Sequence, residues 1–239
     1  MRRDYHRWFS PSLGRDMEML VFGHSGAKVL IFPTSKGRYF EWEDRGMMNL
    51  LGEHLYRGWL QVFCVDSVDA ESWYARYKHP GARAWRQEQY DRYLLHEVMA
   101  LGNQINRTPY WMTVGASFGA YHAANFGLRH PFHINRIIGM SGIYDIDRWT
   151  DGFYNEMVHA HNPAGFISYE HNHWRLEAMR RQDIIIVTGA DDPLRDSSEY
   201  LAGQLWNKGV WPALRVWDGW AHDWPWWEKM LLLYINGPD

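Results

Sequence analysis

The sequence predicts an α/β fold with a mostly parallel central sheet and helices on both of its faces. Three observations indicate this class. The chain has 239 residues, a usual length for one α/β domain. Short apolar runs rich in β-branched and aromatic residues alternate with amphipathic helical patterns. No repeat, low-complexity stretch or Ser/Pro/Gly-rich linker divides the chain, so we expect residues 1–239 to form a single domain.

The predicted strands are the short apolar runs that stop at turn or loop residues. In chain order they are Met17–Phe22, Ala27–Phe32, Leu60–Val65, Tyr110–Val114, Arg136–Met140, Asp183–Val187 and Ala213–Trp217. Only Gly23–Gly26 separates the first two, which predicts an opening hairpin. Helical segments separate most of the others, as is typical of parallel strands joined by crossover helices.

The predicted helices show apolar residues at helical spacing. They are Met47–Arg57, Gln87–Ile105, Ser117–Leu128, Ser197–Trp206 and Trp226–Ile235. Gly58 is expected to end the first of them. Residues 149–181 break the alternation, because this stretch is long, aromatic and rich in His. We interpret it as a small cap-like insertion over the carboxyl ends of the strands, where open α/β sheets bind their ligands.

Charge and cysteine content exclude several classes of protein. The chain carries 25 Lys and Arg against 28 Asp and Glu, a net charge of −3, so nucleic acid is not an expected partner. No apolar run approaches the roughly 18 residues of a membrane helix, and the residues after Arg3 are too polar for a signal peptide. Cys64 is the only cysteine and lies in a predicted strand, so we expect a small buried hydrophobe. The expected compartment is the cytoplasm, and nothing in the sequence specifies an oligomeric state.

Gly115–Gly119 carries the strongest chemical signal in the sequence. It reads Gly-Ala-Ser-Phe-Gly, follows an apolar strand and opens a predicted helix. This is the setting of a nucleophile elbow, a tight turn flanked by small residues that lifts a serine hydroxyl clear of the sheet. The pattern therefore predicts Ser117 as a nucleophile. The N–H of Phe118, the next residue, is then expected to donate to an oxyanion hole.

A serine hydroxyl needs a histidine base, which in turn needs a carboxylate to orient it. In chains with this elbow the order is Ser, acid, His. The strand at Asp183–Val187 runs on into a loop holding Asp191 and Asp192, and the strand at Ala213–Trp217 runs into a loop that holds His222. We predict Asp192 as the acid and His222 as the base.

Other carboxylates compete for the role of the acid. Asp191 is adjacent to Asp192, Asp223 follows His222, and Asp196 is better placed to cap the helix that is expected at Ser197. The second donor of the oxyanion hole is expected in the loop after Ala27–Phe32. Thr34 and Ser35 are the two candidates, and the sequence does not choose between them.

Two His pairs, His159 with His161 and His171 with His173, invite a metal interpretation. Histidines spaced by two can bind zinc, but no Cys and no convincing carboxylate partner stands nearby. We therefore expect no metal site, and the chemistry of Ser117, Asp192 and His222 requires no cofactor.

These residues together resemble the α/β-hydrolase fold, and more narrowly a group of esterases that includes esterase D-like, feruloyl-esterase-like and mycolyltransferase-like proteins. The likeness runs from about Lys28 to Trp227. Besides Gly115–Gly119, it rests on the order of Glu71–Tyr74, Tyr90–Glu97, Met140–Asp145, His161–Phe166, Gly189–Leu194 and Gly219–His222. The resemblance implies a serine hydrolase that cleaves small-molecule carboxylic esters, with Ser117 as nucleophile, Asp192 as acid and His222 as base.

The chain departs from that group in two respects. The loop after the first core strand usually carries a His-Gly type sequence, whereas Pro33–Gly37 reads Pro-Thr-Ser-Lys-Gly. The chain is also short for the group, so a small cap is expected. Alternative functions are an acyltransferase, thioesterase or amidase that uses the same three residues, and a non-catalytic binding protein of the same fold.

The base is surrounded by tryptophan. The chain holds 15 Trp, and Trp220 and Trp224 flank His222 in a loop, where burial in the main core is least easy. A loop Trp beside the base offers a flat and rigid apolar wall. We therefore expect Trp220 and Trp224 to line a shallow substrate cleft that prefers small acyl groups or aromatic esters over long lipid chains.

Overall fold

The computed structural model describes residues Met1–Asn236. The chain divides into two compact units. The first comprises Met1–Tyr110 and Asp147–His161, and the second comprises Trp111–Ile146 and the chain from Asn162 onward. The expectation of a single domain over residues 1–239 stays a prediction, and its last three residues lie outside the described part of the chain.

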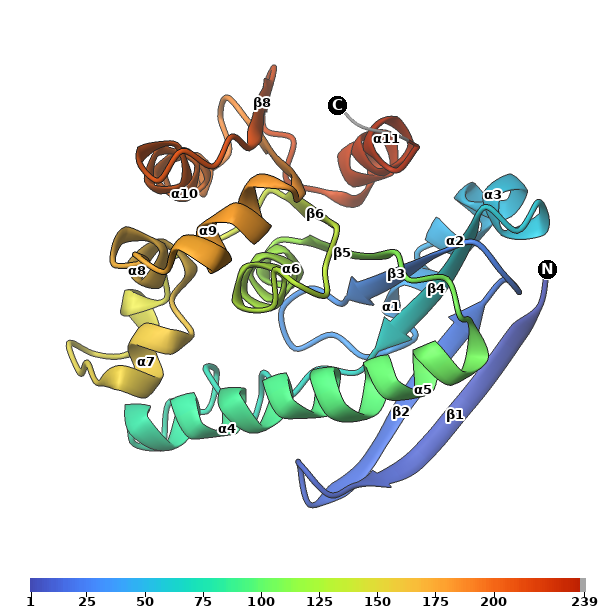
Figure 1. Ribbon diagram of the computed structural model, residues 1–239, viewed down its shortest axis with the longest axis horizontal. Helices are drawn as coiled ribbons and strands as arrows, with labels where there is room; N and C mark the ends of the chain where they lie inside the picture. The colour runs from blue at the N-terminus through green and yellow to red at the C-terminus, as the bar shows by residue number, and fades with distance from the viewer. Residues whose placement is uncertain (237–239) are drawn as a thin grey trace. The chain divides into compact units, whose positions relative to one another are not determined.

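The first unit contains a four-stranded mixed sheet. Its strands are β1 (Arg3–Ser10), β2 (Arg15–Phe22), β3 (Ala27–Phe32) and β4 (Leu60–Val65), in the order β1-β2-β4-β3. β1 and β2 form an antiparallel hairpin (Figure 1). β4 pairs antiparallel with β2 and parallel with β3.

The predicted hairpin between Met17–Phe22 and Ala27–Phe32 is wrong. Both strands exist, but β4 lies between them, and β2 forms its hairpin with β1 instead. The connection from β2 to β3 crosses the start of β4 at close range. A Cβ on Gly26 would lie 2.2 Å from the Trp59 carbonyl oxygen, and one on Gly23 would lie 2.8 Å from that of Leu60. Both glycines have a positive φ, so this connection depends on glycine for reasons other than a hairpin turn.

The first unit contains the two helical segments that were predicted there, with other bounds, and short helices that were not predicted. Its helices are α1 (Glu41–Asp44), α2 (Met47–Leu50), α3 (Gly52–Tyr56), α4 (Pro80–Tyr93), the π-helix η1 (Leu94–Val98), α5 (Met99–Ile105), the 3₁₀ helix η2 (Asp147–Trp149) and α7 (Glu156–Ala160). The helix predicted at Met47–Arg57 is split into α2 and α3, and Gly58, with φ 69°, follows its end as expected.

The long helix predicted at Gln87–Ile105 begins earlier, at Pro80. His79 caps it by accepting a hydrogen bond from the Gly81 N–H at 3.2 Å, and proline is well suited to the first turn. α4, η1 and α5 then follow one another without a break as one long helical rod (Figure 1).

The second unit contains four parallel strands. They are β5 (Trp111–Ala116), β6 (Arg136–Met140), β7 (Asp183–Gly189) and β8 (Ala213–Trp217), paired in that order. The helices are α6 (Phe118–Arg129), α8 (Pro163–Ser168), α9 (His173–Arg180), α10 (Arg195–Asn207) and α11 (Trp224–Tyr234). The bounds predicted for β6 and β8, and for β3 and β4 in the first unit, are confirmed residue for residue.

The core of the second unit forms around β5, β6 and α6. Every residue of β5 and β6 is buried, as expected for parallel strands covered on both faces. α6 is also buried along nearly its whole length, and a Cβ on Gly127 would lie 2.5 Å from the Ile137 side chain. The helix therefore packs closely on β6, and a larger residue at position 127 would require the Ile137 side chain to move.

The predicted insertion at residues 149–181 contributes to both units. In the first unit, the ring of Trp149 packs on Tyr74 at 5.8 Å and that of Phe153 on His79 at 4.6 Å. In the second unit, α8 packs on α10. The position of this segment over the carboxyl ends of the strands stays a prediction.

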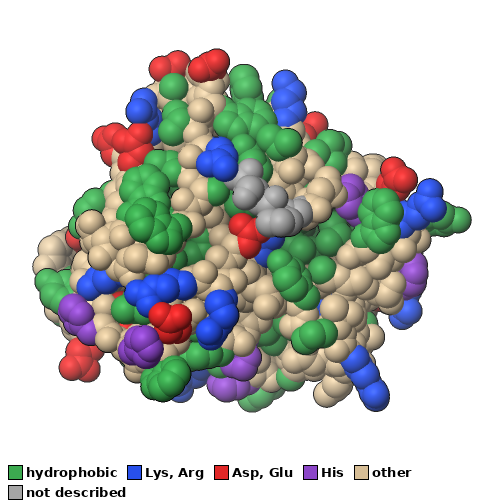
Figure 2. Space-filling model, turned by 45° about the horizontal axis from the view of Figure 1, so that its top comes forward, with side chains coloured by type: hydrophobic (Ala, Val, Ile, Leu, Met, Phe, Trp, Pro, Cys, Tyr) green, Lys and Arg blue, Asp and Glu red, His purple; other side chains and the backbone are tan. Residues whose placement is uncertain are grey.

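The burial of Cys64 and the character of the surface can be compared with the expectations from the sequence. Cys64 is buried in β4 as predicted, and burial raises the pKa of its thiol. Several large apolar side chains reach the surface among charged ones (Figure 2). No helix within Met1–Asn236 combines the length and apolar character needed to cross a bilayer.

Candidate active site

Ser117 occupies the junction between β5 and α6 with φ 55° and ψ −120°. Few residues other than glycine adopt such a conformation, which costs on the order of 1–3 kcal/mol. Glycine is required sterically at position 115, since a Cβ on Gly115 would lie 2.1 Å from the Gly119 carbonyl oxygen. The Ser117 N–H donates to the Met140 carbonyl at 2.9 Å, which ties the turn to the end of β6. The predicted elbow is therefore present as a strained, tightly packed turn.

Phe118 is the first residue of α6, so its N–H belongs to the helix N-terminus, where the helix dipole favours negative charge. Its ring is buried and packs on Tyr121 at 4.9 Å and on His122 at 5.2 Å. These contacts fix the residue that follows Ser117.

The loops after β7 and β8 are joined by backbone hydrogen bonds. The Ala190 N–H donates to the Trp217 carbonyl at 2.7 Å, and the Asp191 N–H donates to that of Gly219 at 2.9 Å. At Gly189 a Cβ would lie 2.4 Å from the Trp220 carbonyl oxygen, so glycine is needed for the approach. The two segments that were predicted to hold the acid and the base thus form one rigid assembly.

His222 pairs with Asp192 within this assembly. Its Nδ1 lies 3.0 Å from Oδ1 and 3.1 Å from Oδ2 of Asp192. The Asp192 side chain is fully buried, whereas that of His222 is 18% exposed. The carboxylate also accepts a hydrogen bond from the Leu194 N–H at 2.8 Å. The imidazole is therefore oriented through one nitrogen while the ring keeps access to solvent.

Opposing effects act on the pKa of Asp192. Burial by itself would raise this pKa, but the hydrogen bonds from His222 and Leu194, the nearby imidazole charge and the Ser141 hydroxyl lower it. The balance places the pKa of Asp192 below its ordinary value. The carboxyl is therefore held in its charged form, the form that orients a histidine base.

The competing carboxylates have other surroundings. Asp191 is exposed, and Asp196 lies in the first turn of α10, which begins at Arg195 and not at the expected Ser197. Asp223 precedes α11 and accepts the Trp224 N–H at 2.8 Å. Of the four acidic candidates named from the sequence, Asp192 is the one that contacts His222.

Ser141 connects the loop that holds His222 to α11, and no role for it was predicted from the sequence. It follows β6 with φ 50° and is fully buried. Its hydroxyl donates to the Ala221 carbonyl at 2.8 Å, immediately before His222, and accepts from Trp227 Nε1 at 3.1 Å. Its proton can also turn toward Asp192, whose pKa it helps to lower. The segment Met140–Asp145 entered the sequence resemblance, but nothing in it marked the serine.

Three tryptophans surround the imidazole at different depths. Trp220 is 54% exposed, its ring lies 6.2 Å from that of His222, and its Nε1 donates to the His222 carbonyl at 3.2 Å. Trp227 is buried, with its ring 5.4 Å from the imidazole. Trp224 packs on Trp227 at 5.2 Å. Trp220 thus lies beside the base as expected, Trp224 contacts it through an intervening ring, and Trp227 was missed because it falls in a helical pattern.

Thr34 and Ser35 belong to the first unit and have different partners there. Both the N–H and the hydroxyl of Thr34 donate to the carboxylate of Glu41, each at 2.7 Å. The Ser35 hydroxyl accepts a hydrogen bond from the Tyr74 hydroxyl at 2.8 Å. Among the described residues no acceptor is found for the Ser35 N–H, so it is the better donor of the two.

The two histidine pairs have different surroundings. His159 Nδ1 bonds to the Tyr154 hydroxyl, and His161 Nε2 lies 3.1 Å from Glu88 Oε2. His171 and His173 are exposed. Over residues 1–236, no three His, Cys, Asp or Glu side chains gather in a way that could hold a metal ion.

Comparison with known proteins supports the fold through structure and not through sequence. No protein-family model and no curated protein sequence matches the chain. A ferulic acid esterase structure matches with a TM-score of 0.77 and 18% identity, over 99% of this chain and 96% of the other. The S-formylglutathione hydrolase of Agrobacterium tumefaciens gives a TM-score of 0.75 and 14% identity, over 98% of this chain and 93% of the other.

A third similar structure is the fluorophosphonate-binding serine hydrolase F of Staphylococcus aureus. It has a TM-score of 0.68 and 14% identity, and the match covers 98% of this chain and 97% of the other. These near-complete matches confirm the predicted α/β-hydrolase fold, and they agree with the esterase group that the sequence resembles. At these identities the likeness establishes the fold alone.

Proposed function

We propose that this protein is a serine hydrolase that cleaves carboxylic esters through an acyl-enzyme. The observation that carries the proposal is the buried Asp192 bonded to His222 Nδ1, in the same compact unit as the strained elbow at Ser117. A charged carboxylate on Nδ1 keeps the imidazole in the tautomer whose Nε2 accepts a proton. The fold adds support, because the similar structures include a ferulic acid esterase and a fluorophosphonate-binding serine hydrolase.

In the proposed reaction, His222 Nε2 takes the proton of Ser117 as the hydroxyl oxygen attacks the ester carbonyl. The tetrahedral intermediate collapses, and His222 returns that proton to the departing alcohol. Water then gives its proton to His222 and attacks the acyl group on Ser117. The carboxylic acid leaves as the serine regains its proton. Throughout, Asp192 stays ionised and stabilises the transient imidazolium.

The negative charge of the intermediate requires two N–H donors. We assign one to Phe118, the first residue of α6 after the nucleophile. The source of the second stays a prediction from the sequence, Thr34 or Ser35, and of these two the Thr34 N–H is already held by Glu41. The two bonds from Thr34 to Glu41 fix this loop within the first unit.

The substrate class follows from the tryptophans and from the similar structures. Trp220 provides an exposed flat wall beside His222, and Trp224 extends the aromatic surface through Trp227. Such a wall suits a small acyl group or an aromatic ester. One similar structure is that of a ferulic acid esterase and another that of an S-formylglutathione hydrolase. The substrate panel should therefore include both oxygen esters and thioesters.

Labelling and a substrate panel test the proposal together. A fluorophosphonate probe should label the wild type once and leave Ser117→Ala unlabelled. A panel of p-nitrophenyl esters and matched thioesters of increasing chain length should show hydrolysis of short acyl and aromatic oxygen esters. A competing alcohol added to the reaction identifies an acyltransferase by its transesterified product. Absence of labelling and of hydrolysis would favour a non-catalytic binding protein.

A further inference from the structure

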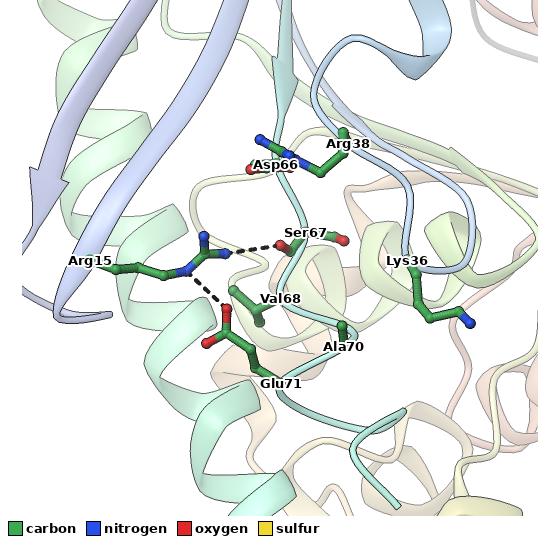
Figure 3. Close-up of a pocket in the computed structure, with 8 residues that line it drawn as sticks. All are labelled: Arg15, Lys36, Arg38, Asp66, Ser67, Val68, Ala70 and Glu71. Carbon is green, nitrogen blue, oxygen red and sulfur yellow. Dashed lines mark hydrogen bonds and ion pairs between the residues drawn. The ribbon is translucent and has the colours of Figure 1, made fainter.

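A pocket of about 220 Å³ opens in the first unit, next to the loop of Thr34 and Ser35 but lined by neither of them. It lies at the carboxyl ends of β3 and β4, beside the start of β2 (Figure 3). This edge of a parallel sheet is where α/β folds place their ligands. At about 30 Å³ for each water molecule, the space matches about seven waters or a small organic molecule.

Charged side chains dominate the lining of the pocket. Arg15, Lys36 and Arg38 are cationic, Asp66 and Glu71 are anionic, and smaller residues such as Val68 and Ala70 complete the wall. The lining contains three cations and two carboxylates, an excess of one positive charge, and Lys36 lies on the opposite wall from Arg15 (Figure 3).

The loop that carries Lys36 is held in place from several sides. Lys36 has φ 58°, and its N–H donates to Asp69 Oδ2 at 2.8 Å. The Ser67 hydroxyl donates to the Gly37 carbonyl at 2.8 Å, which joins this loop to the one after β4. The pocket wall is therefore built by backbone contacts that do not depend on the Lys36 side chain.

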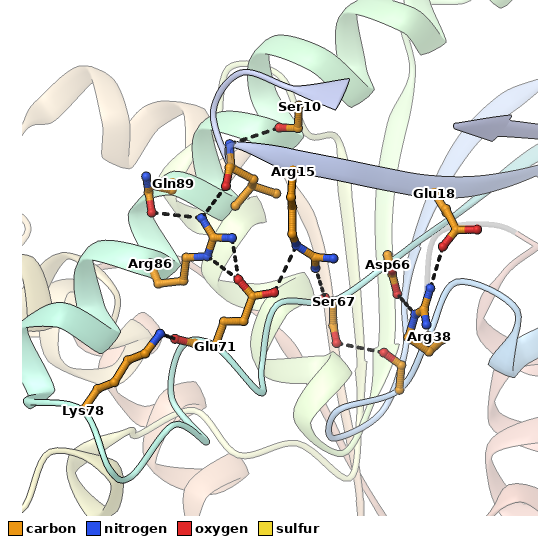
Figure 4. Close-up of polar contacts among 12 residues, drawn as sticks. Ser10, Arg15, Glu18, Arg38, Asp66, Ser67, Glu71, Lys78, Arg86 and Gln89 are labelled. Carbon is orange, nitrogen blue, oxygen red and sulfur yellow. Dashed lines mark hydrogen bonds and ion pairs between the residues drawn. The ribbon is translucent and has the colours of Figure 1, made fainter. Parts of the chain in front are cut away.

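Both carboxylates of the pocket already pair with arginine side chains (Figure 4). Asp66, with a side chain only 2% exposed, accepts from Arg38 Nε at 2.8 Å. Glu71 lies 3.0 Å from Arg15 Nε and accepts from Arg86 Nε at 2.9 Å. The pocket therefore has little free acceptor capacity.

Several N–H donors of the cationic side chains, in contrast, remain available to a ligand. Arg15 uses Nε on Glu71 and Nη2 on the Ser67 carbonyl, and Arg38 uses Nε on Asp66 and Nη2 on Glu18. Within residues 1–236, no partner is found for Nη1 of either arginine. The Lys36 ammonium lies 5.5 Å from the Tyr74 ring and pairs with no described carboxylate. A surplus of charged donors over acceptors favours an anionic ligand.

We propose that this pocket binds a small molecule bearing one carboxylate, held by Lys36 with Arg15 and Arg38. A single negative charge balances the excess positive charge of the lining. A phosphate, with nearly two charges at neutral pH, would face the carboxylates of Asp66 and Glu71 less favourably. Val68 and Ala70 leave room for a short apolar tail. This proposal is independent of the proposed hydrolysis, because the ligand is bound and not consumed.

The test is an amide NMR titration of the full chain with butyrate, compared with the neutral butyramide at constant ionic strength. Butyrate should give saturable shifts at Lys36 and around Ser67–Glu71, with an affinity at least about tenfold above that of butyramide. Lys36→Gln should weaken butyrate binding about tenfold, and Arg15→Gln should weaken it as well. Arg57→Gln removes the same charge from an exposed helix end outside the lining and should bind as the wild type does.

Several results would overturn the proposal. Equal binding of butyrate and butyramide would show that charge is not recognised. Binding that is unchanged in both Lys36→Gln and Arg15→Gln would place the ligand elsewhere, and tighter binding of inorganic phosphate would remove the carboxylate assignment. The amide spectra report on the fold of each variant, and Arg15→Gln keeps the test decisive if Lys36→Gln does not fold, since Glu71 retains Arg86.

Discussion

The Nδ1 atom of His222 lies almost equally far from both carboxylate oxygens of Asp192, at 3.0 and 3.1 Å. This arrangement fixes the rotation of the imidazole and directs its other nitrogen away from the acid. The backbone bonds between the loops after β7 and β8 hold the two residues together independently of the side-chain contact. The pair is therefore organised before any substrate binds, as electrostatic preorganisation requires.

Replacing the nucleophile is the most direct test of the proposed function. Ser117→Ala should lower kcat for ester hydrolysis by about 10⁴-fold or more, because the acyl-enzyme cannot form. Circular dichroism and the thermal unfolding midpoint should match or exceed those of the wild type, since the change removes only a hydroxyl. Residual activity within about tenfold of the wild type would contradict the assignment.

The acid is tested by two adjacent substitutions that remove the same charge. Asp192→Asn should lower kcat by about 10⁴-fold, since an amide at this position favours the wrong imidazole tautomer. Asp191→Asn is the matched control and should change kcat less than about threefold, because Asp191 is exposed and does not contact His222. If the two effects are reversed, Asp191 is the acid.

Activity should fall toward acidic pH through one ionisation. The lowered pKa of Asp192 keeps this carboxylate charged at every pH above its ordinary value of about 3.9. Its stabilising effect is therefore present above that pH and is lost as pH falls through the lower folded-state pKa. A decline in kcat/KM between about pH 8 and 5, the range in which histidines change charge, would thus report on the base. A profile that stays flat down to about pH 4 would exclude a histidine base.

Ser141 should act as a positioning residue for His222. Ser141→Ala removes the bonds to the Ala221 carbonyl and to Trp227, and we expect kcat to fall by about 10- to 100-fold with little change in KM. Ser141→Gly is the control, because it removes the same hydroxyl but relieves the strain of φ 50°. Equal losses in both variants identify the hydroxyl as the cause. Wild-type kcat in Ser141→Gly would show that the hydroxyl does not position the base.

The exposed tryptophans should determine substrate preference. Trp220→Ala should raise KM for aromatic and short-chain esters several-fold and shift the chain-length profile, with little effect on the unfolding midpoint, because Trp220 is 54% exposed. Trp224→Ala should have a smaller effect, since Trp224 contacts the base through Trp227. Preference for acyl chains of about twelve carbons or more would contradict the shallow cleft, as would two variants that unfold without changing specificity.

The sequence predicted the parallel strands well for a physical reason. Parallel strands that are buried on both faces read as apolar runs, and the bounds of β3, β4 and β6 could be read directly. The bounds of β8 were also predicted, although β8 is an edge strand with no fully buried residue. β1 escaped because it alternates between exposed and half-buried residues and carries several charges. The insertion of β4 between β2 and β3 could not be foreseen, since strand order depends on pairing between distant segments.

The sequence by itself also determined which side chains to consider for catalysis. Ser117, Asp192 and His222 each follow a strand, and residues after parallel strands reach the same edge of a sheet. Local sequence favoured Asp192 over the adjacent Asp191, and the tertiary structure distinguishes the two by the burial of Asp192 and its contact with His222. Ser141 and Trp227 were found only in the tertiary structure, which brings Ser141 to Ala221 across 80 residues of chain. Their roles arise from contacts between segments remote in sequence, and no local pattern of residues encodes such contacts.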